Sequence, residues 1–206
     1  MKNFQLVKCG NKGTLVGSGM ATKKILFIEG EPNTPNGDLR QGFAKLLGKR
    51  IEGQLPRINL GGGKSQTVRK FLKNKFEADA FLLLIDLDRP EEEKEQDIKD
   101  NDLFPQRENV FYMVLEMESW FLSQPDVLDG FFGVDNKQKK VSDKLSKRKI
   151  TEIPDPKGEL KKATKDSKRG EYHEIKHAVE LLKLIDAKRL EDTFIDFKNL
   201  IERLKA

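Results

Sequence analysis

The chain has 206 residues, of which 36% are hydrophobic and 35% are charged, so it can build a core for one α/β domain with an appendage or for two very small domains. A single cysteine, Cys9, excludes an intrachain disulfide and a cysteine-rich zinc site, and the scarcity of histidine (His173 and His177) favours a metal held by oxygen, Mg²⁺ or Mn²⁺. The formal net charge of +5 permits a polyanionic partner without requiring one.

Residues 1–22 form an N-terminal extension with several glycines, in which residues 4–8 and 14–16 can pair as a small hairpin. The first residues lack the long apolar stretch of a signal peptide. No apolar run in the chain reaches the length needed to cross a bilayer. We therefore expect a cytoplasmic protein with no membrane partner.

Residues 23–130 alternate between strand and helix patterns, as in a mostly parallel, Rossmannoid α/β sheet flanked by helices. Continuous apolar runs are typical of strands that are covered on both faces. The predicted strands are residues 25–28, 56–60, 80–85 and 110–115, and the predicted helices between them lie near residues 39–47 and 68–72. The pattern predicts one α/β core.

The character of the sequence changes in residues 131–170, which we expect to be a basic, largely irregular arm. Within residues 137–170, 13 Lys or Arg stand against 5 Asp or Glu, a net charge of 13 − 5 = +8, with little apolar periodicity. Residues 171–206 carry two helical patterns that are expected to form a C-terminal extension packed on the core.

Four basic residues of the arm are candidate nucleic-acid contacts: Lys139, Lys140, Lys147 and Arg148. Their positive charges can neutralise phosphates and produce salt-dependent binding. The arm lacks interleaved aromatic residues, so base stacking is not indicated there. The alternative is that this run of charge is solvated surface.

Carboxylates follow two of the predicted strands. Glu29 comes directly after the first strand, and Asp86 and Asp88 follow the third. Ligands of parallel sheets bind beyond the carboxyl ends of the strands, so these side chains are expected to meet at one rim. Carboxylates at such short distances repel one another unless a cation such as Mg²⁺ or Mn²⁺ neutralises them. Solvated turn residues are the alternative.

A run of three glycines precedes a lysine at positions 61–64. Ile58 stands where a Walker P-loop requires its first glycine, so this motif is excluded. The backbone amides of Gly62 and Gly63, with the side chain of Lys64, are candidates for phosphate binding at the start of the next helix. A tight turn between strand and helix is the preferred alternative.

These motifs resemble the TOPRIM fold of topoisomerases, primases and OLD-type nucleases, which has a Glu at the end of the first strand and an Asp-x-Asp at the end of the third. More closely, the chain resembles a bacterial family known only as a TOPRIM-like domain of unknown function, whose members lie beside an ABC-type ATPase in predicted phage-defence operons. The resembling segments are residues 25–31, 39–47, 60–71, 82–90, 113–122 and 172–186.

The resemblance implies that Glu29 is a metal ligand or general base and that Asp86 and Asp88 bind Mg²⁺ or Mn²⁺. OLD-type nucleases add a glutamate after the following strand, where this chain has Glu118. They also use a late basic residue on the phosphate, for which Lys176 is the nearest match. The alternative for Glu118 is a structural role in the first turn of a helix, where the helix dipole stabilises a carboxylate. The alternative for Lys176 is a position on a solvated helix face.

The resemblance thus implies a Mg²⁺-dependent nuclease that acts on DNA more than on RNA, with a partner ATPase, in antiviral defence. Pro90 stands where some TOPRIM motifs have a further aspartate, so the number of bound metals is left open. Whether the chain forms a homo-oligomer is also left open. Two other functions remain as alternatives, a non-catalytic adaptor of an ATPase complex and a phosphohydrolase of small molecules.

Overall fold

The computed structural model describes residues 23–31 and 38–206, and the hairpin expected within residues 1–22 lies outside them. Within the described residues, four strands form a parallel sheet in the order β2-β1-β3-β4. The strands are β1 (Lys24–Ile28), β2 (Arg57–Leu60), β3 (Ala80–Asp86) and β4 (Val110–Met113). The prediction of a parallel α/β sheet flanked by helices is confirmed.

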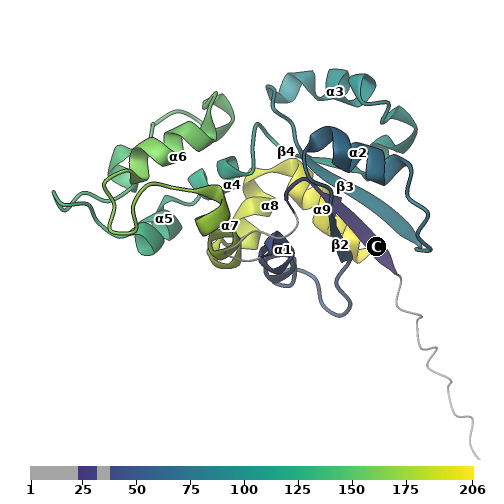
Figure 1. Cartoon of the computed structure of the whole chain (residues 1–206), viewed down its shortest axis with the longest axis horizontal. Coiled ribbons are helices and arrows are strands. Elements are labelled where there is room, and N and C mark those ends of the chain that lie inside the picture. The colour runs from purple at the N-terminus through teal and green to yellow at the C-terminus, as the bar shows by residue number, and fades with distance from the viewer. Residues whose placement is uncertain (1–22, 32–37) are drawn as a thin grey trace, which may run out of the picture.

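The central strands are apolar along their whole length because both faces of the sheet are covered. Ile25 and Phe27 of β1 face a smaller core, which the helices α2 (Lys64–Leu72) and α3 (Lys94–Asp100) help to form. Leu26 and Ile28 face a larger core on the opposite side of the sheet. Figure 1 shows α2 and α3 on one side of the sheet and the C-terminal helix on the other.

The larger core is built by helices from both ends of the chain. They are α1 (Leu39–Leu47), α7 (Glu174–Leu184), α8 (Ala187–Thr193) and α9 (Ile195–Lys205). Helix α1 packs closely on α7 at Gly42, where an added Cβ would stand 2.9 Å from Leu182 Cδ1 and 3.2 Å from the carbonyl oxygen of Val179. Residues that follow the α/β core in sequence therefore complete the packing of its first helix.

The second of the two C-terminal helical patterns is divided in the structure. Helix α8 ends and α9 begins around Phe194, whose backbone is extended (φ −119°, ψ 110°) and whose ring is buried. The apolar residues on both sides of the break face the same core, so their spacing alone did not reveal it.

A further helical region lies beyond the carboxyl ends of the strands (Figure 1). It contains α4 (Glu118–Leu122), α5 (Pro125–Phe132) and α6 (Pro156–Thr164). Short 3₁₀ helices complete the described elements: η1 (Glu91–Glu93), η2 (Phe104–Asn109), η3 (Ser142–Lys144) and η4 (Ile150–Glu152).

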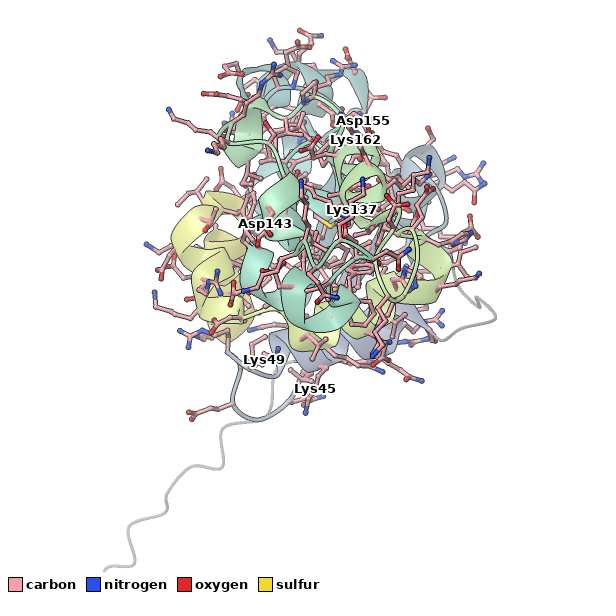
Figure 2. All side chains as sticks on the ribbon, turned by 90° about the vertical axis from the view of Figure 1, so that its left-hand side faces the viewer. Lys45, Lys49, Lys137, Asp143, Asp155 and Lys162 are labelled. Atoms are coloured by element: carbon pink, nitrogen blue, oxygen red, sulfur yellow. The ribbon has the colours of Figure 1, made fainter. Side chains whose placement is uncertain are left out.

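The basic segment at residues 131–170 is irregular over most of its length, as expected, but it packs on the rest of the chain. It includes α6, and its side chains Val141, Ile153 and Leu160 are buried in the larger core. These apolar residues are too widely spaced to produce a periodic pattern, so the prediction missed them. Its surface mixes both charges, as Lys137, Asp143, Asp155 and Lys162 illustrate in Figure 2.

The order of the strands places a topological switch point between β1 and β3. From β1 the chain passes through α1 to β2 on one side, and from β2 it returns through α2 to β3 on the other side of β1. Ligands of open α/β sheets bind in the crevice at such a point, beyond the carboxyl ends of the strands. No helix among the described residues is both long and apolar enough to span a membrane.

Candidate functional site

An acidic cavity lies at the switch point predicted by the topology. It has a volume of about 240 Å³. Within the described part of the chain, its charged lining consists of six carboxylate residues and one lysine: Glu29, Glu31, Asp86, Glu116, Glu118, Glu174 and Lys157. The sheet, the start of α4, the start of α6 and the start of α7 each contribute to this lining.

Glu29 and Asp86 lie side by side at the ends of β1 and β3. The backbone N–H of Asp86 donates a hydrogen bond to Glu29 Oε2 at 3.1 Å. In the side chain of Asp86, the oxygen Oδ1 is buried and has no hydrogen-bond partner among the described residues. The sequence-based expectation that these two carboxylates meet at one rim is met in this geometry.

Both carboxylates have pKa values that are raised above their ordinary values. Burial, followed by the charges of Glu29 and Glu118, raises the pKa of Asp86 well above its ordinary value. Burial also raises the pKa of Glu29, although the hydrogen bond from the Asp86 backbone opposes this effect. A group that is buried, unpartnered and surrounded by like charges favours either a proton or a cation in its neighbourhood.

Glu118 and Lys157 line the far wall of the cavity, and the buried Tyr172 supports Glu118. Glu118 is only 3% exposed, and its Oε1 accepts a hydrogen bond of 2.9 Å from the buried hydroxyl of Tyr172. Lys157 Nζ lies 4.0 Å from the same oxygen and forms an ion pair with Glu174. Burial raises the pKa of Glu118, while Lys157 and Tyr172 oppose that rise.

Lys157 is the basic residue of the site, although sequence reasoning selected Lys176 for this role. Burial alone would lower the pKa of Lys157, but the hydrogen bond to Glu174 and the nearby charges of Glu118 and Glu116 outweigh it and raise the pKa. Lys176 is exposed on α7 and does not line the cavity. Lys157 was hidden among the lysines of the basic segment, and no signal in the sequence distinguished Tyr172.

Asp88 does not line the cavity, although its charge helps to raise the pKa of both Glu29 and Asp86, and its role as a metal ligand stays a prediction. Its side chain is 54% exposed and its Oδ2 lies 3.3 Å from Lys64 Nζ. The backbone turns away after Leu87, because Asp88 adopts a left-handed conformation (φ 56°) while its N–H donates to the carbonyl of Leu115.

The glycines at positions 61–63 form a tight turn between β2 and α2, which was the preferred interpretation of this run. Gly30 and Gly62 exchange backbone hydrogen bonds of 2.9 and 3.0 Å, which clip the loops after β1 and β2 together. An added Cβ at Gly61 would stand 2.0 Å from Thr67 Oγ1, so only glycine fits there. Lys64 is not directed into the cavity, since its Nζ contacts Asp88, Asp97 and the carbonyl of Leu87.

Gly62 and Gly63 nevertheless line the acidic cavity, so their phosphate contact stays a prediction. The four predicted basic contacts of residues 131–170 are exposed and away from this cavity: Lys139, Lys140, Lys147 and Arg148. Their contact with nucleic acid also stays a prediction.

The residues of the cavity fit a hydrated divalent cation better than a fully protein-ligated one. No three His, Cys, Asp or Glu side chains of residues 23–31 and 38–206 lie close enough to hold one ion together. Mg²⁺ is commonly bound through one or two carboxylates and retains several waters. The unpartnered Asp86 Oδ1 and the neighbouring Glu29 carboxylate offer that kind of ligand set.

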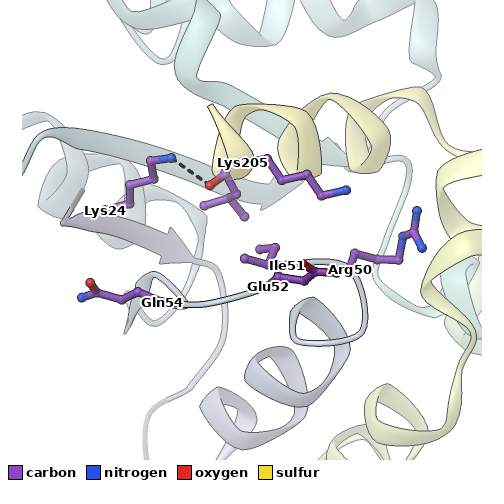
Figure 3. Close-up of a pocket in the computed structure, with 7 residues that line it drawn as sticks. Lys24, Arg50, Ile51, Glu52, Gln54 and Lys205 are labelled. Atoms are coloured by element: carbon purple, nitrogen blue, oxygen red, sulfur yellow. Dashed lines mark hydrogen bonds between the residues drawn. The ribbon is translucent and has the colours of Figure 1, made fainter. Parts of the chain in front are cut away.

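A second cavity, of about 440 Å³, lies at the opposite end of the sheet, where β1 begins (Figure 3). Two of its cations, Lys24 and Arg50, contact the C-terminal helices. Lys24 Nζ donates to the carbonyl of Leu204 at 2.8 Å, and Arg50 donates two hydrogen bonds to the carboxylate of Glu191. We assign a structural role to these contacts.

Comparison with known proteins identifies a family but no activity. A family model described as "Domain of unknown function (DUF4276)" matches residues 34–205, which is most of the chain. No curated protein and no solved structure matches the chain.

Proposed function

The chain belongs to this family, whose description assigns no activity, and we propose from the acidic cavity that it is a metal-dependent phosphodiesterase with a TOPRIM-like fold. The supporting observation is the buried, unpartnered Oδ1 of Asp86 beside the carboxylate of Glu29, at the switch point of a parallel sheet. We further propose that the substrate is nucleic acid, DNA more than RNA, and that an ABC-type ATPase is the partner in antiviral defence.

Four residues that line the cavity have roles in this proposal. Glu29 and Asp86 would hold Mg²⁺ or Mn²⁺, and the bound metal would neutralise phosphate charge and lower the pKa of a water. Alternatively, Glu29 would act as the general base that accepts a proton from the attacking water. Lys157 would contact the phosphate, and Glu118 would position Lys157 from the buried wall.

In the reaction, the oxygen of water forms a bond to phosphorus and the bond from phosphorus to the ester oxygen breaks. The departing oxygen takes up a proton, so that one end of the product carries a phosphate and the other a hydroxyl. No redox partner is needed. The acidic wall repels a polyanion unless the cation is present, so the reaction is expected to depend strictly on metal.

The purified full chain should cleave labelled DNA in Mn²⁺ or Mg²⁺ and lose this activity in EDTA. Asp86→Asn and Glu29→Gln are each expected to reduce the rate by about 100-fold or more, a loss similar to that of other electrostatic groups in active sites. The matched control is Glu108→Gln, which removes an exposed carboxylate that lies outside the cavity. Wild-type rates in Asp86→Asn would reject the proposal.

The same experiment separates the two alternatives. Hydrolysis of free nucleotides without cleavage of any polymer would indicate a small-molecule phosphohydrolase. Failure to hydrolyse either substrate, combined with co-purification of an ATPase, would indicate a non-catalytic adaptor. DNA and RNA are compared as single strands and as duplexes in the same assay.

A further inference from the structure

A basic and aromatic surface lies on the side of the sheet that carries α2. It surrounds a cavity of about 570 Å³. We define this basic-aromatic surface by the following residues: Arg57, Asn59, Arg69, Lys70, Lys73, Asn74, Lys75 and Phe76. No carboxylate of the described chain lines the cavity, in contrast to the site at the switch point.

The surface is available because β2 is at the edge of the sheet. Arg57 and Asn59 pair with Ile25 and Phe27 of β1, so they face the side on which α2 packs. Helix α2 packs mainly on β1 and β3. The face of β2 that carries Arg57 and Asn59 therefore borders the cavity instead of a helix.

The cations of this surface form no ion pairs within the described chain. Among the described residues, no Asp or Glu lies within 4.0 Å of the charged groups of the five basic residues, which are Arg57, Arg69, Lys70, Lys73 and Lys75. Arg69 and Lys73 are four residues apart at the end of α2, where like charges repel each other. The helix dipole favours basic residues at this end, but it does not explain Arg57 and Lys75.

Phe76 adds an aromatic ring to this group of cations. The ring is 40% exposed, and its inner side is supported by the buried ring of Phe27 at a centroid distance of 6.3 Å. The guanidinium of Arg57 lies 4.9 Å from the centre of the Phe76 ring. Exposed aromatic rings and guanidinium planes stack on unpaired bases, while the lysines around them attract the phosphates.

The surface is connected to the acidic cavity through α2. Gly63 precedes this helix and lines the acidic cavity, whereas Arg69 and Lys70 in its last turn line the basic one. The nine residues of α2 span about 13 Å. That length corresponds to about four nucleotides of a stacked strand at about 3.4 Å each. Lys70 also donates to the carbonyl of Gly61, in the loop that joins the two cavities.

We propose that the basic-aromatic surface binds single-stranded nucleic acid, with an unpaired base on Phe76 and Arg57 and phosphates on Lys73 and Lys75. The bound strand runs along α2 toward the acidic cavity. Because a base within a duplex cannot stack on a protein ring, single strands bind more tightly than duplexes. This inference deepens the proposed function by naming its substrate class, and it rests on that function only for the cleavage of the strand.

Binding is measured by fluorescence anisotropy of a labelled oligonucleotide of about 12 nucleotides with the full chain in EDTA, so that hydrolysis does not contribute. Phe76→Leu is expected to weaken binding at least about five-fold, as for the loss of a stacked base. The double substitution Lys73→Gln/Lys75→Gln is expected to reduce the slope of log Kd against log salt by about 1.4, for two lost phosphate contacts.

Matched controls come from other faces of the chain. Phe104→Leu removes a ring that is 58% exposed and is also covered by a guanidinium, that of Arg107. Lys45→Gln/Lys198→Gln removes two exposed lysines from α1 and α9. Both controls should bind within about two-fold of wild type, because neither touches the basic-aromatic surface. Thermal denaturation of each variant confirms that it is folded.

Wild-type affinity in Phe76→Leu and in Lys73→Gln/Lys75→Gln would overturn the inference, as would equal losses in the matched controls. Tighter binding of a duplex than of its single strands would overturn it as well. Failure of the wild type to cleave the bound strand in Mn²⁺ would instead reject the proposed function and leave the binding surface assigned.

Discussion

Replacing Asp86 with asparagine is expected to make the protein more stable at neutral pH while removing its activity. The carboxylate of Asp86 is held among other acidic groups, and one of its oxygens is buried without a hydrogen-bond partner in the described chain. Asparagine has nearly the same shape and no charge. The substitution therefore removes the repulsion from Glu29 and Glu118 without opening a cavity.

The sign of the pH dependence follows from the direction of the pKa shift. Burial and the neighbouring carboxylates raise the folded-state pKa of Asp86 well above its ordinary value of 3.8. Such a group binds more protons in the folded state than in the unfolded state. Its contribution to stability is fully present below the unfolded pKa and is lost as the pH rises through the folded pKa. The wild type is thus penalised at neutral pH, and the variant is not.

The size of the effect is limited by two opposing terms. Each unit of pKa shift corresponds to about 1.4 kcal/mol, so even a modest shift is measurable. The new amide is also partly buried and needs an acceptor, for which the carboxylate of Glu29 is available. We expect a net gain of about 1–2 kcal/mol at pH 8 and close to none at pH 3. For a chain of this length, the corresponding rise in Tm is about 2–8 °C.

The measurement is urea denaturation of wild type and Asp86→Asn at several pH values between 3 and 8. Asp88→Asn is the matched control, because it makes the same chemical change on a side chain that is 54% exposed. Its ion pair with Lys64 contributes at most about 1 kcal/mol, so this variant should show no gain. Added Mn²⁺ should stabilise the wild type and leave Asp86→Asn unchanged.

Equal or lower stability of Asp86→Asn at pH 8 would refute this reasoning. That result would mean that the Asp86 carboxylate is already compensated in the folded protein. A gain of the same size at pH 3 would also refute it, because protonation removes the charge from the wild type there.

Two further predictions concern residues next to the lining of the acidic cavity. Gly61→Ala should destabilise the protein by about 3 kcal/mol or more, because the new methyl group would overlap Thr67. Gly63→Ala is the control, since an added Cβ there meets open space, and it should have little effect. Thermal denaturation measures both variants. Tyr172→Phe should cost about 1–3 kcal/mol at pH 7.5 because Glu118 loses its hydrogen bond, and less at pH 4.5, where a raised pKa favours the protonated form of Glu118. An equal cost at both pH values would contradict this account of Glu118.

Much of the sheet could be predicted from local patterns. The runs that became β1 and β3 are continuously apolar, which is what two covered faces require. Glu29 and Asp86 could be assigned to one rim because the carboxyl ends of parallel strands meet there. The absence of Asp88 from the lining of the cavity could not be predicted in this way, since it depends on a left-handed backbone turn after Leu87.

The remaining site residues could not be predicted because they come from elements distant in sequence. Lys157 is one of many lysines in its segment, and only the packing of α6 brings it to the cavity. Tyr172 precedes α7 without any motif, yet its hydroxyl reaches Glu118 in the buried wall. The basic-aromatic surface depends on the register of β2 against β1, which the sequence does not reveal.

The sequence by itself determined which segments are strands and which carboxylates end them, because both depend on residues close together in the chain. Only the tertiary structure decided which lysine reaches the acidic cavity, which oxygen lacks a partner and which face of β2 is free. These features depend on how helices from distant parts of the chain pack around the sheet. That packing follows from the burial of apolar side chains, which directs the helices without indicating in advance which polar groups they bring together.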